Sequence, residues 1–78
     1  MPLSSQPDPA LGAVLKQLRD ARAVTQEDLA HNAKIAVSTL QAIENARSEP
    51  GWQTVRRLVA ALGVTMTELA KAIDKHER

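Results

Sequence analysis

The sequence predicts an all-α fold, a compact domain of five short helices. Apolar residues recur every three or four positions in several segments, which is the spacing of a helix with one buried face. Ala, Leu and Val dominate the hydrophobic 44% of the chain, and Phe and Tyr are absent. This composition suits closely packed helices better than a sheet. Helix-start and helix-stop signals place the expected helices at residues 9–22, 26–33, 37–45, 52–62 and 66–75.

The first helix is expected to begin at Pro9. Asp8 is a favourable N-cap, and a proline at the first helical position loses no hydrogen bond. Gly12 lies inside this helix, where it costs about 1 kcal/mol relative to Ala, so we expect it to mark a close contact with another helix. The inner face is expected to carry Leu11, Val14 or Leu15, and Leu18.

The segment 25–45 is predicted to form two helices joined by a tight turn. Thr25 is a good N-cap, and Asp28 follows it at the spacing of a capping box. Ala30 is small enough for two helices to cross closely at a steep angle. One face of the segment is apolar and suits a core, whereas the other is available to a partner.

This segment resembles the helix-turn-helix of the lambda repressor and Cro-type (Xre-like) family of bacterial and phage DNA-binding regulators. The similarity extends upstream to residues 11–19 and covers roughly three quarters of the chain. It implies a compact five-helix, lambda-repressor-like DNA-binding domain over residues 8–75, in which the helix at 37–45 is the recognition helix. The matching residues are Thr25, Gln26, Leu29, Ala30, Ile35, Leu40, Ile43, Glu44, Pro50, Thr54, Leu58, Ala61, Leu62, Val64 and Leu69.

Three residues depart from the family pattern where helices end. Ala23, Lys34 and Ala46 stand where the family usually has Gly, the residue that adopts a left-handed backbone at little cost. Either these turns are strained, or neighbours such as Asn32 and Asn45 absorb the left-handed conformation.

The outer side of the recognition helix supplies the candidates for base contacts. Gln41 can bind the edge of an adenine through two hydrogen bonds, and Ser38 can bind several bases. No Arg lies among these residues, so the commonest guanine contact is missing and we expect modest specificity with some A·T preference. The candidate base-contacting residues are Val37, Ser38, Gln41 and Ala42.

Cations, hydroxyls and a helix start near the motif supply the candidates for phosphate contacts. Arg47, in the loop after the recognition helix, is the first choice. The helix start at Gln26 presents unpaired N–H groups to an anion, and Lys34 places a cation near the DNA backbone. The candidate phosphate-contacting residues are Gln26, Lys34, Thr39, Arg47, Gln53 and Thr54.

The resemblance also implies an ion pair between Arg19 and Glu44. A bidentate pair of Arg and carboxylate would fix the first helix against the end of the recognition helix. The alternative is that Arg19 is a solvated surface residue, which would add little to stability.

The last two helices are predicted to complete the core and to offer a dimer surface. Trp52 is expected to face inward, at helical spacing from Val55 and Val59. Thr65 and Glu68 form a capping box for the last helix. The apolar stripe of that helix has little to cover it in so short a chain, so we expect part of it to meet a second copy. The candidate dimer-interface residues are Met66, Leu69, Ala72 and Ile73.

The length of 78 residues fits one domain. Residues 1–7 are rich in Pro and Ser and contain no Lys or Arg, so we expect a disordered N-terminal arm there and a frayed tail at 76–78. The chain has no Cys, and it shows no signal-peptide pattern and no apolar run of membrane-spanning length. We therefore expect a cytoplasmic protein with no membrane partner.

The favoured hypothesis is a transcriptional regulator that binds double-stranded DNA as a homodimer and reads an inverted-repeat operator through the major groove. The net charge is only +1, so this prediction rests on the motif. The alternative is a protein-interaction module, such as an antitoxin-type partner binder, that keeps the fold with weak or no specific DNA binding. We expect no enzymatic activity, cofactor, metal site or small-molecule substrate, and we interpret His31 and His76 as surface residues.

Overall fold

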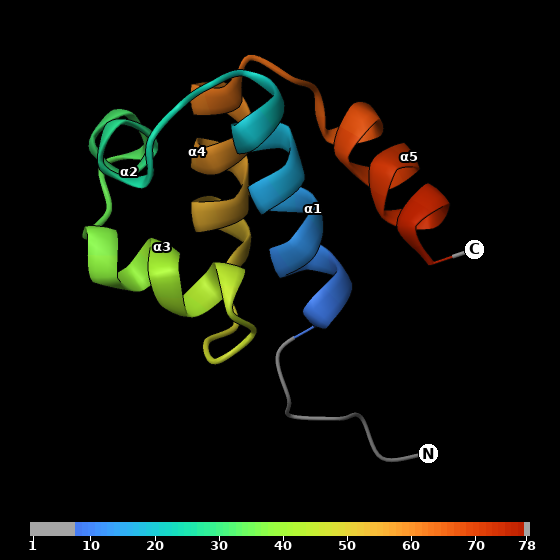
Figure 1. Cartoon of the computed structure of the whole chain (residues 1–78), viewed down its shortest axis with the longest axis horizontal. Helices are drawn as coiled ribbons and strands as arrows, with labels where there is room; N and C mark the ends of the chain where they lie inside the picture. The colour runs from blue at the N-terminus through green and yellow to red at the C-terminus, as the bar shows by residue number, and fades with distance from the viewer. Residues whose placement is uncertain (1–7, 78) are drawn as a thin grey trace.

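The computed structural model describes residues 8–77. Within this range the chain forms five α-helices and no strand, which confirms the predicted fold class (Figure 1). None of these helices is long and apolar enough to cross a membrane. The expected arm at residues 1–7 and the last residue of the expected tail, Arg78, lie outside the described residues. The helices are α1 (Pro9–Ala21), α2 (Gln26–Ala33), α3 (Val37–Glu44), α4 (Trp52–Leu62) and α5 (Met66–His76).

The observed helix bounds agree with the expected ones to within one residue. α1 and α3 each end one residue earlier than predicted, and α5 continues to His76, which the sequence analysis had assigned to the frayed tail. His76 is helical because its turn remains hydrogen-bonded: the N–H of Glu77 donates to the carbonyl of Ile73 at 3.0 Å.

Three helices begin with the side-chain caps that the sequence predicts. Asp8 accepts a hydrogen bond from the N–H of Ala10 at 2.9 Å, and the Thr25 hydroxyl accepts one from Asp28 at 3.0 Å. At the start of α5, Thr65 and Glu68 form the reciprocal capping box. Each cap satisfies N–H groups that the first turn of a helix leaves unpaired. α3 and α4 begin without a side-chain cap.

The sequence analysis left two alternatives for the helix ends, strained turns or neighbours that absorb the left-handed conformation. The structure shows the first. Ala23, Lys34 and Ala46 have φ angles of 54°, 60° and 57°, in the left-handed region. Asn45 has a φ of −91° and does not take over the left-handed position. The strain therefore falls on the three residues that stand in place of Gly.

The same type of backbone hydrogen bond closes each of these three left-handed turns. In each case the N–H of the next residue donates to the carbonyl five positions earlier, as in the Schellman motif. The bonds run from Val24 to Arg19 at 3.1 Å, from Ile35 to Ala30 at 3.0 Å and from Arg47 to Ala42 at 2.8 Å.

The core draws aliphatic side chains from every helix. Val14 and Leu15 are both buried, so α1 presents both of the residues that the sequence analysis treated as alternatives. The most enclosed side chains belong to α1, α2, α3 and α4, and they are Leu15, Leu29, Leu40 and Leu58.

Gly12 marks a close contact between helices, as its position predicts. A Cβ atom on Gly12 would lie 2.5 Å from the carbonyl oxygen of Ile43 and 2.8 Å from that of Glu44. Only a residue without a side chain lets α1 approach the last turn of α3 this closely.

The inward orientation predicted for Trp52 is wrong, because this side chain is 66% exposed. Its helical spacing does place Trp52 on the same side of α4 as the core residues Val55 and Val59. However, Trp52 is the first residue of the helix, and at that end the core no longer covers it.

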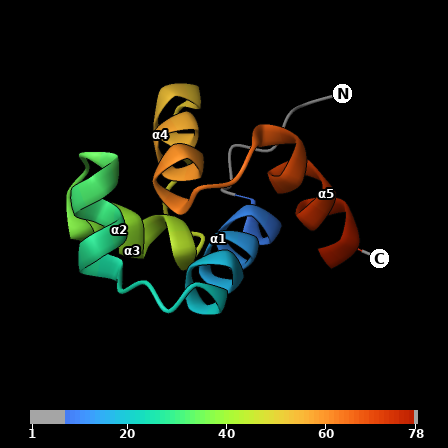
Figure 2. The same ribbon diagram turned by 90° about the horizontal axis from the view of Figure 1, so that it is seen from above.

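α1 lies between the helix-turn-helix and the last helix. It packs against α3 and α5, whereas α2 packs against α3 and α4. Figures 1 and 2 both place α5 on the side of the molecule away from α2 and α3. Consequently a partner bound at α5 leaves the outer side of α3 open.

The strain at Ala23 predicts that Ala23→Gly stabilises the protein. Gly removes the strain of the left-handed backbone in the folded state, but it also raises the conformational entropy of the unfolded chain. We expect the first effect to be larger, so that the free energy of unfolding measured with urea rises by about 1 kcal/mol. The matched control is Ala60→Gly, at a solvent-exposed position within α4, which is expected to lower the free energy of unfolding by about 1 kcal/mol. Equal losses in both variants would show that Ala23 is not strained.

Candidate nucleic-acid interface

The outer side of α3 carries the candidate base-contacting residues. Ser38 and Gln41 are exposed, whereas Val37 and Ala42 are half-buried. Val37 packs against the core, so part of its surface is already covered. Among these four residues, the polar groups available to a partner are the hydroxyl of Ser38 and the amide of Gln41.

The structure brings Arg19 and Glu44 together as a buried, bidentate pair. Arg19 Nε lies 2.8 Å from Glu44 Oε2, and Arg19 Nη2 lies 3.0 Å from Glu44 Oε1. The remaining terminal nitrogen, Nη1, donates to the carbonyl of Val24 at 3.0 Å. Arg19 is 8% exposed and Glu44 is 9% exposed, so both charges are largely removed from water and depend on each other.

These hydrogen bonds also affect the titration of Arg19. The side-chain hydrogen bonds to Glu44 raise the pKa of the guanidinium, and the negative charge of Glu44 adds to this effect. Since Arg is already protonated at ordinary pH, Arg19 stays positively charged beside Glu44 across the pH range of the cell.

Gln26 joins this pair, a contact that the sequence analysis did not anticipate. Its Nε2 donates to Glu44 Oε1 at 3.0 Å, and its Oε1 accepts a long hydrogen bond of 3.4 Å from Gln41 Nε2. The side chain predicted to contact phosphate is thus engaged within the protein. No local signal in the sequence links residues 26, 41 and 44.

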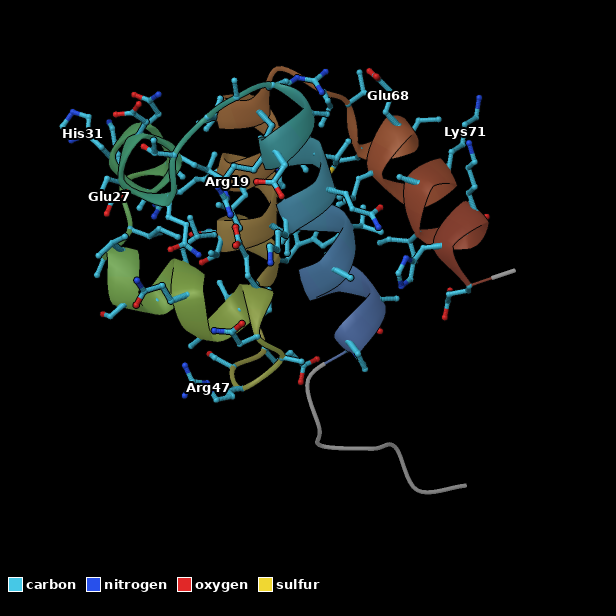
Figure 3. All side chains as sticks on the ribbon, viewed as in Figure 1. Arg19, Glu27, His31, Arg47, Glu68 and Lys71 are labelled. Atoms are coloured by element: carbon cyan, nitrogen blue, oxygen red, sulfur yellow. The ribbon has the colours of Figure 1, made fainter. Side chains whose placement is uncertain are left out.

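The other candidate phosphate-contacting side chains remain available to a partner. Within residues 8–77, none of them takes part in a side-chain hydrogen bond or ion pair. Arg47 is exposed in the loop that follows α3 (Figure 3). Lys34 lines a shallow hollow with Arg57 of α4, a neighbouring cation that is not among the predicted phosphate contacts. The exposed members of the set are Lys34, Thr39, Arg47 and Gln53, whereas Thr54 is half-buried.

A sequence comparison assigns the family. A family model described as a helix-turn-helix domain matches residues 10–72 of the chain. The protein belongs to the helix-turn-helix family. In this family context α2 and α3 are the two helices of the motif, and α3 is its recognition helix.

One curated relative of this helix-turn-helix protein is the HTH-type transcriptional regulator DdrOP3 of Deinococcus deserti. The two are 30% identical over 60 residues, which make up 77% of this chain and 46% of DdrOP3. The chain therefore spans about half the length of the curated relative that it matches.

Solved structures of two restriction-modification controller proteins share the fold. C.AhdI from Aeromonas hydrophila is 26% identical, with a TM-score of 0.76 over 78% of this chain and 92% of that chain. Wild-type C.Esp1396I is 20% identical, with a TM-score of 0.85 over 88% of each chain, a likeness of fold. C.Esp1396I has also been solved bound to a 19-base-pair DNA duplex.

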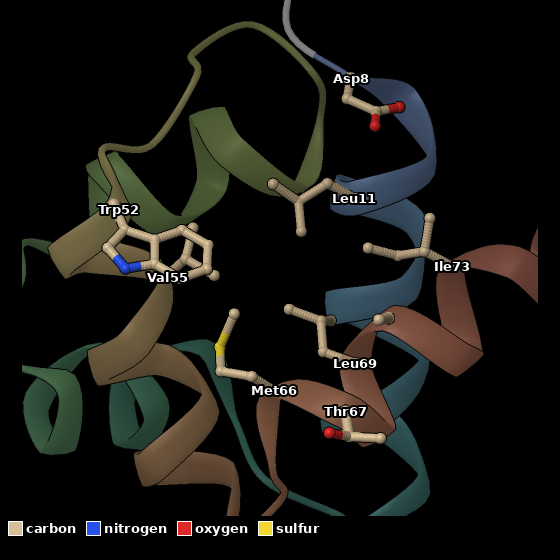
Figure 4. A pocket seen from close by; sticks show the side chains of 9 residues that line it. Asp8, Leu11, Trp52, Val55, Met66, Thr67, Leu69 and Ile73 are labelled. Atoms are coloured by element: carbon tan, nitrogen blue, oxygen red, sulfur yellow. The ribbon is translucent and has the colours of Figure 1, made fainter.

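This helix-turn-helix protein also has an apolar groove between α1, α4 and α5 (Figure 4). The groove has a volume of about 550 Å³. Of the candidate dimer-interface residues, Met66 and Ile73 line it and are half-buried, while Ala72 is half-buried outside it. Leu69 is only 3% exposed, so it belongs to the core and forms part of the groove wall. The sequence analysis missed the other large apolar residues of the groove, Leu11, Trp52 and Val55.

The buried pair predicts that Arg19→Met strongly destabilises this helix-turn-helix protein. The substitution leaves Glu44 buried without its cation, at an expected cost of about 3–5 kcal/mol in urea unfolding followed by circular dichroism. The matched control is Arg22→Met at an exposed position nearby, which is expected to change stability by less than about 0.5 kcal/mol. A similar effect from both substitutions would show that the pair does not hold the fold.

Proposed function

We propose that the protein is a sequence-specific DNA-binding transcriptional regulator that places α3 in the major groove of its operator. The observation that carries this proposal is the position of Gln41. It is exposed on the recognition helix and hydrogen-bonded to a buried ion pair through Gln26. Membership of the helix-turn-helix family and the likeness to the regulator DdrOP3 support the same function.

The chemistry of α3 suggests which bases it reads. The Gln41 amide offers a donor and an acceptor to an adenine edge, and the Ser38 hydroxyl can donate or accept. Val37 and Ala42 offer methyl groups to a thymine methyl. An operator with A·T pairs at the contacted positions fits this set best.

Phosphate contacts would supply much of the affinity and make it dependent on salt. Arg47 is the main candidate because it is exposed at the end of α3. Lys34, Thr39, Gln53 and Thr54 remain further candidates, and Arg57 joins them because it shares a hollow with Lys34. Gln26 retains its backbone N–H at the start of α2 for such a contact.

Selection of bound sequences from a random duplex pool tests the proposed function directly. The purified protein is incubated with the pool at near-physiological salt, and the bound fraction is sequenced. Enrichment of a short inverted repeat is the expected result. Binding without enrichment, lost as salt rises, would contradict sequence-specific recognition and favour the protein-interaction alternative.

Gln41 and Arg47 are predicted to affect binding in different ways. Gln41→Ala should weaken binding to the selected operator by about tenfold and leave binding to random duplexes nearly unchanged. Arg47→Ala should weaken binding to all duplexes and reduce the salt slope by about one. Fluorescence anisotropy at several salt concentrations measures both effects. Equal losses from both variants on every duplex would contradict this division of roles.

We also propose that two copies associate through the face formed by α5 and the apolar groove. Trp52 is 66% exposed and lines the groove together with the half-buried Leu11, Met66 and Ile73, and an exposed aromatic residue beside an apolar groove suits an interface between proteins. α5, which forms one wall of the groove, lies on the side of the molecule away from α2 and α3 (Figures 1 and 2). Such a dimer leaves both recognition helices free to reach successive major grooves about 34 Å apart.

Trp52→Ser provides the test of this dimer. Because the side chain is exposed, we expect little loss of folding stability but at least about tenfold weaker dimerisation in sedimentation equilibrium, as for a central aromatic residue of an interface. The control is Arg56→Ser, which removes another exposed side chain of α4 outside the groove. Dimerisation of Trp52→Ser at wild-type strength would rule out the groove as the interface.

The protein-interaction alternative keeps one specific observation in its favour. The same groove, with its exposed Trp52, offers an apolar surface to an unrelated protein as well as to a second copy. This alternative assigns no role to the exposed Gln41 amide, so we place it second. The proposed role on DNA implies a cytoplasmic location and requires no catalytic residue.

A further inference from the structure

A cationic furrow runs along the outer side of α4. Two hollows of about 350 and 380 Å³ lie there, and Arg57 and Ala60 line both of them. The first hollow extends to Gln53 at the start of α4, and the second extends to the end of α2, which packs against α4 (Figures 1 and 2). We call this surface the α4 furrow, and its main residues are Lys34, Gln53, Arg56, Arg57, Ala60 and Ala61.

The α4 residues of the furrow share one side of the helix because of their spacing. Positions 53, 56, 57, 60 and 61 recur every three or four residues, which is the spacing of one helix face. A helix rises by about 1.5 Å per residue, so this face is about 12 Å long. A peptide of two or three helical turns matches that length.

Positive charge is concentrated in the α4 furrow. Lys34, Arg56 and Arg57 are exposed, and neither hollow has an Asp or Glu in its lining. Within residues 8–77, these three cations take part in no side-chain hydrogen bond and no ion pair. The whole chain is nearly neutral, with 10 Lys and Arg against 9 Asp and Glu. The furrow is therefore a local cationic site, which attracts anionic groups.

The floor between these cations is apolar. Ala60 is exposed and Ala61 is half-buried, and Ala33 of α2 adds a third methyl group to the second hollow. A DNA backbone gains little from such a floor, because its contacts are hydrogen bonds from polar donors. A polypeptide segment that carries both carboxylates and apolar side chains can use the cations and the floor together. The lining therefore favours an acidic polypeptide over DNA.

We propose that the α4 furrow binds an acidic amphipathic segment of a partner protein. Carboxylates of the segment pair with the three cations, and its apolar side chains lie on the alanine floor. The furrow shares no lining residue with the apolar groove between α1, α4 and α5 that we assign to a second copy. The inference goes beyond the proposed function and does not depend on it, because the segment binds without DNA.

A pair of synthetic peptides provides the first test. The probe is a fluorescein-labelled peptide of about twelve residues, in which Leu recurs at helical spacing and Glu and Ala fill the other positions. The matched peptide has Gln in place of every Glu. Fluorescence anisotropy at near-physiological salt should show micromolar binding of the Glu peptide and at least about tenfold weaker binding of the Gln peptide. Equal affinity for both peptides, or no binding of the Glu peptide, would overturn the proposal.

Removal of charge from the furrow should weaken binding of the Glu peptide. We expect a loss of about tenfold for the double variant Arg56→Ala and Arg57→Ala. The matched control is Lys16→Ala with Arg22→Ala, which removes the same charge from exposed positions of α1 and should stay within about twofold of wild type. Trp52→Ser should also stay within about twofold, because Trp52 lines the separate groove. Equal losses in both double variants would show only a general attraction between opposite charges and would overturn the proposal.

Ala60→Gln tests the apolar floor without changing the charge. The position is exposed, so the melting temperature should stay near that of wild type. The longer side chain fills the part of the floor that both hollows share, and we expect about fivefold weaker binding of the Glu peptide. Ala21→Gln, at an exposed position of α1, is the matched control and should leave this binding unchanged.

Arg56 distinguishes a partner protein from the other possible occupants of the furrow. Arg56→Ala should bind a random duplex within about twofold of wild type, unlike Arg47→Ala. Equal losses from these two variants, with no effect of Ala60→Gln on the Glu peptide, would assign the furrow to DNA phosphates and overturn the proposal. Weaker self-association of Arg56→Ala in sedimentation equilibrium would assign it to a second copy instead. Failure of the duplex selection would overturn the proposed function alone, because the peptide measurements contain no DNA.

Discussion

The buried contact between Arg19 and Glu44 is the interaction on which the side of the molecule that we propose to face DNA depends. It joins α1 to the last turn of α3, at the place where Gly12 lets the two backbones approach closely. The same carboxylate accepts a hydrogen bond from Gln26, so it also organises the surface next to α3. One carboxylate thus serves both the packing of the motif and the orientation of its polar side chains.

Much of the fold could be predicted from the sequence because its signals are local. The caps at Asp8, Thr25 and Thr65 fix helix starts within three residues of themselves, and Gly63 ends α4 with a left-handed φ of 75°. Local chemistry of this kind needs no knowledge of distant residues. The pairing of Arg19 with Glu44, which are 25 residues apart, was suggested by the family resemblance and not by any local pattern.

The missed features depend on where helices cross and where they end. Periodicity assigns Trp52 to the inner side of α4, but it does not show that an open groove lies beside the first turn of this helix. The contact between Gln26 and Glu44 spans 18 residues and exists only because α2 and α3 meet at a particular angle. Residue types alone could therefore nominate Gln26 as a donor, but they could not identify its acceptor.

The exposure of Trp52 has a further consequence for studying the protein in solution. Trp52 is the one Trp of the sequence, which contains no Tyr or Phe, so its indole dominates the intrinsic ultraviolet fluorescence. An indole that is 66% exposed emits from a watery environment, and covering the groove moves it to an apolar one. The protein therefore carries an intrinsic fluorescent probe at the groove, which can report occupancy of that surface without any attached dye.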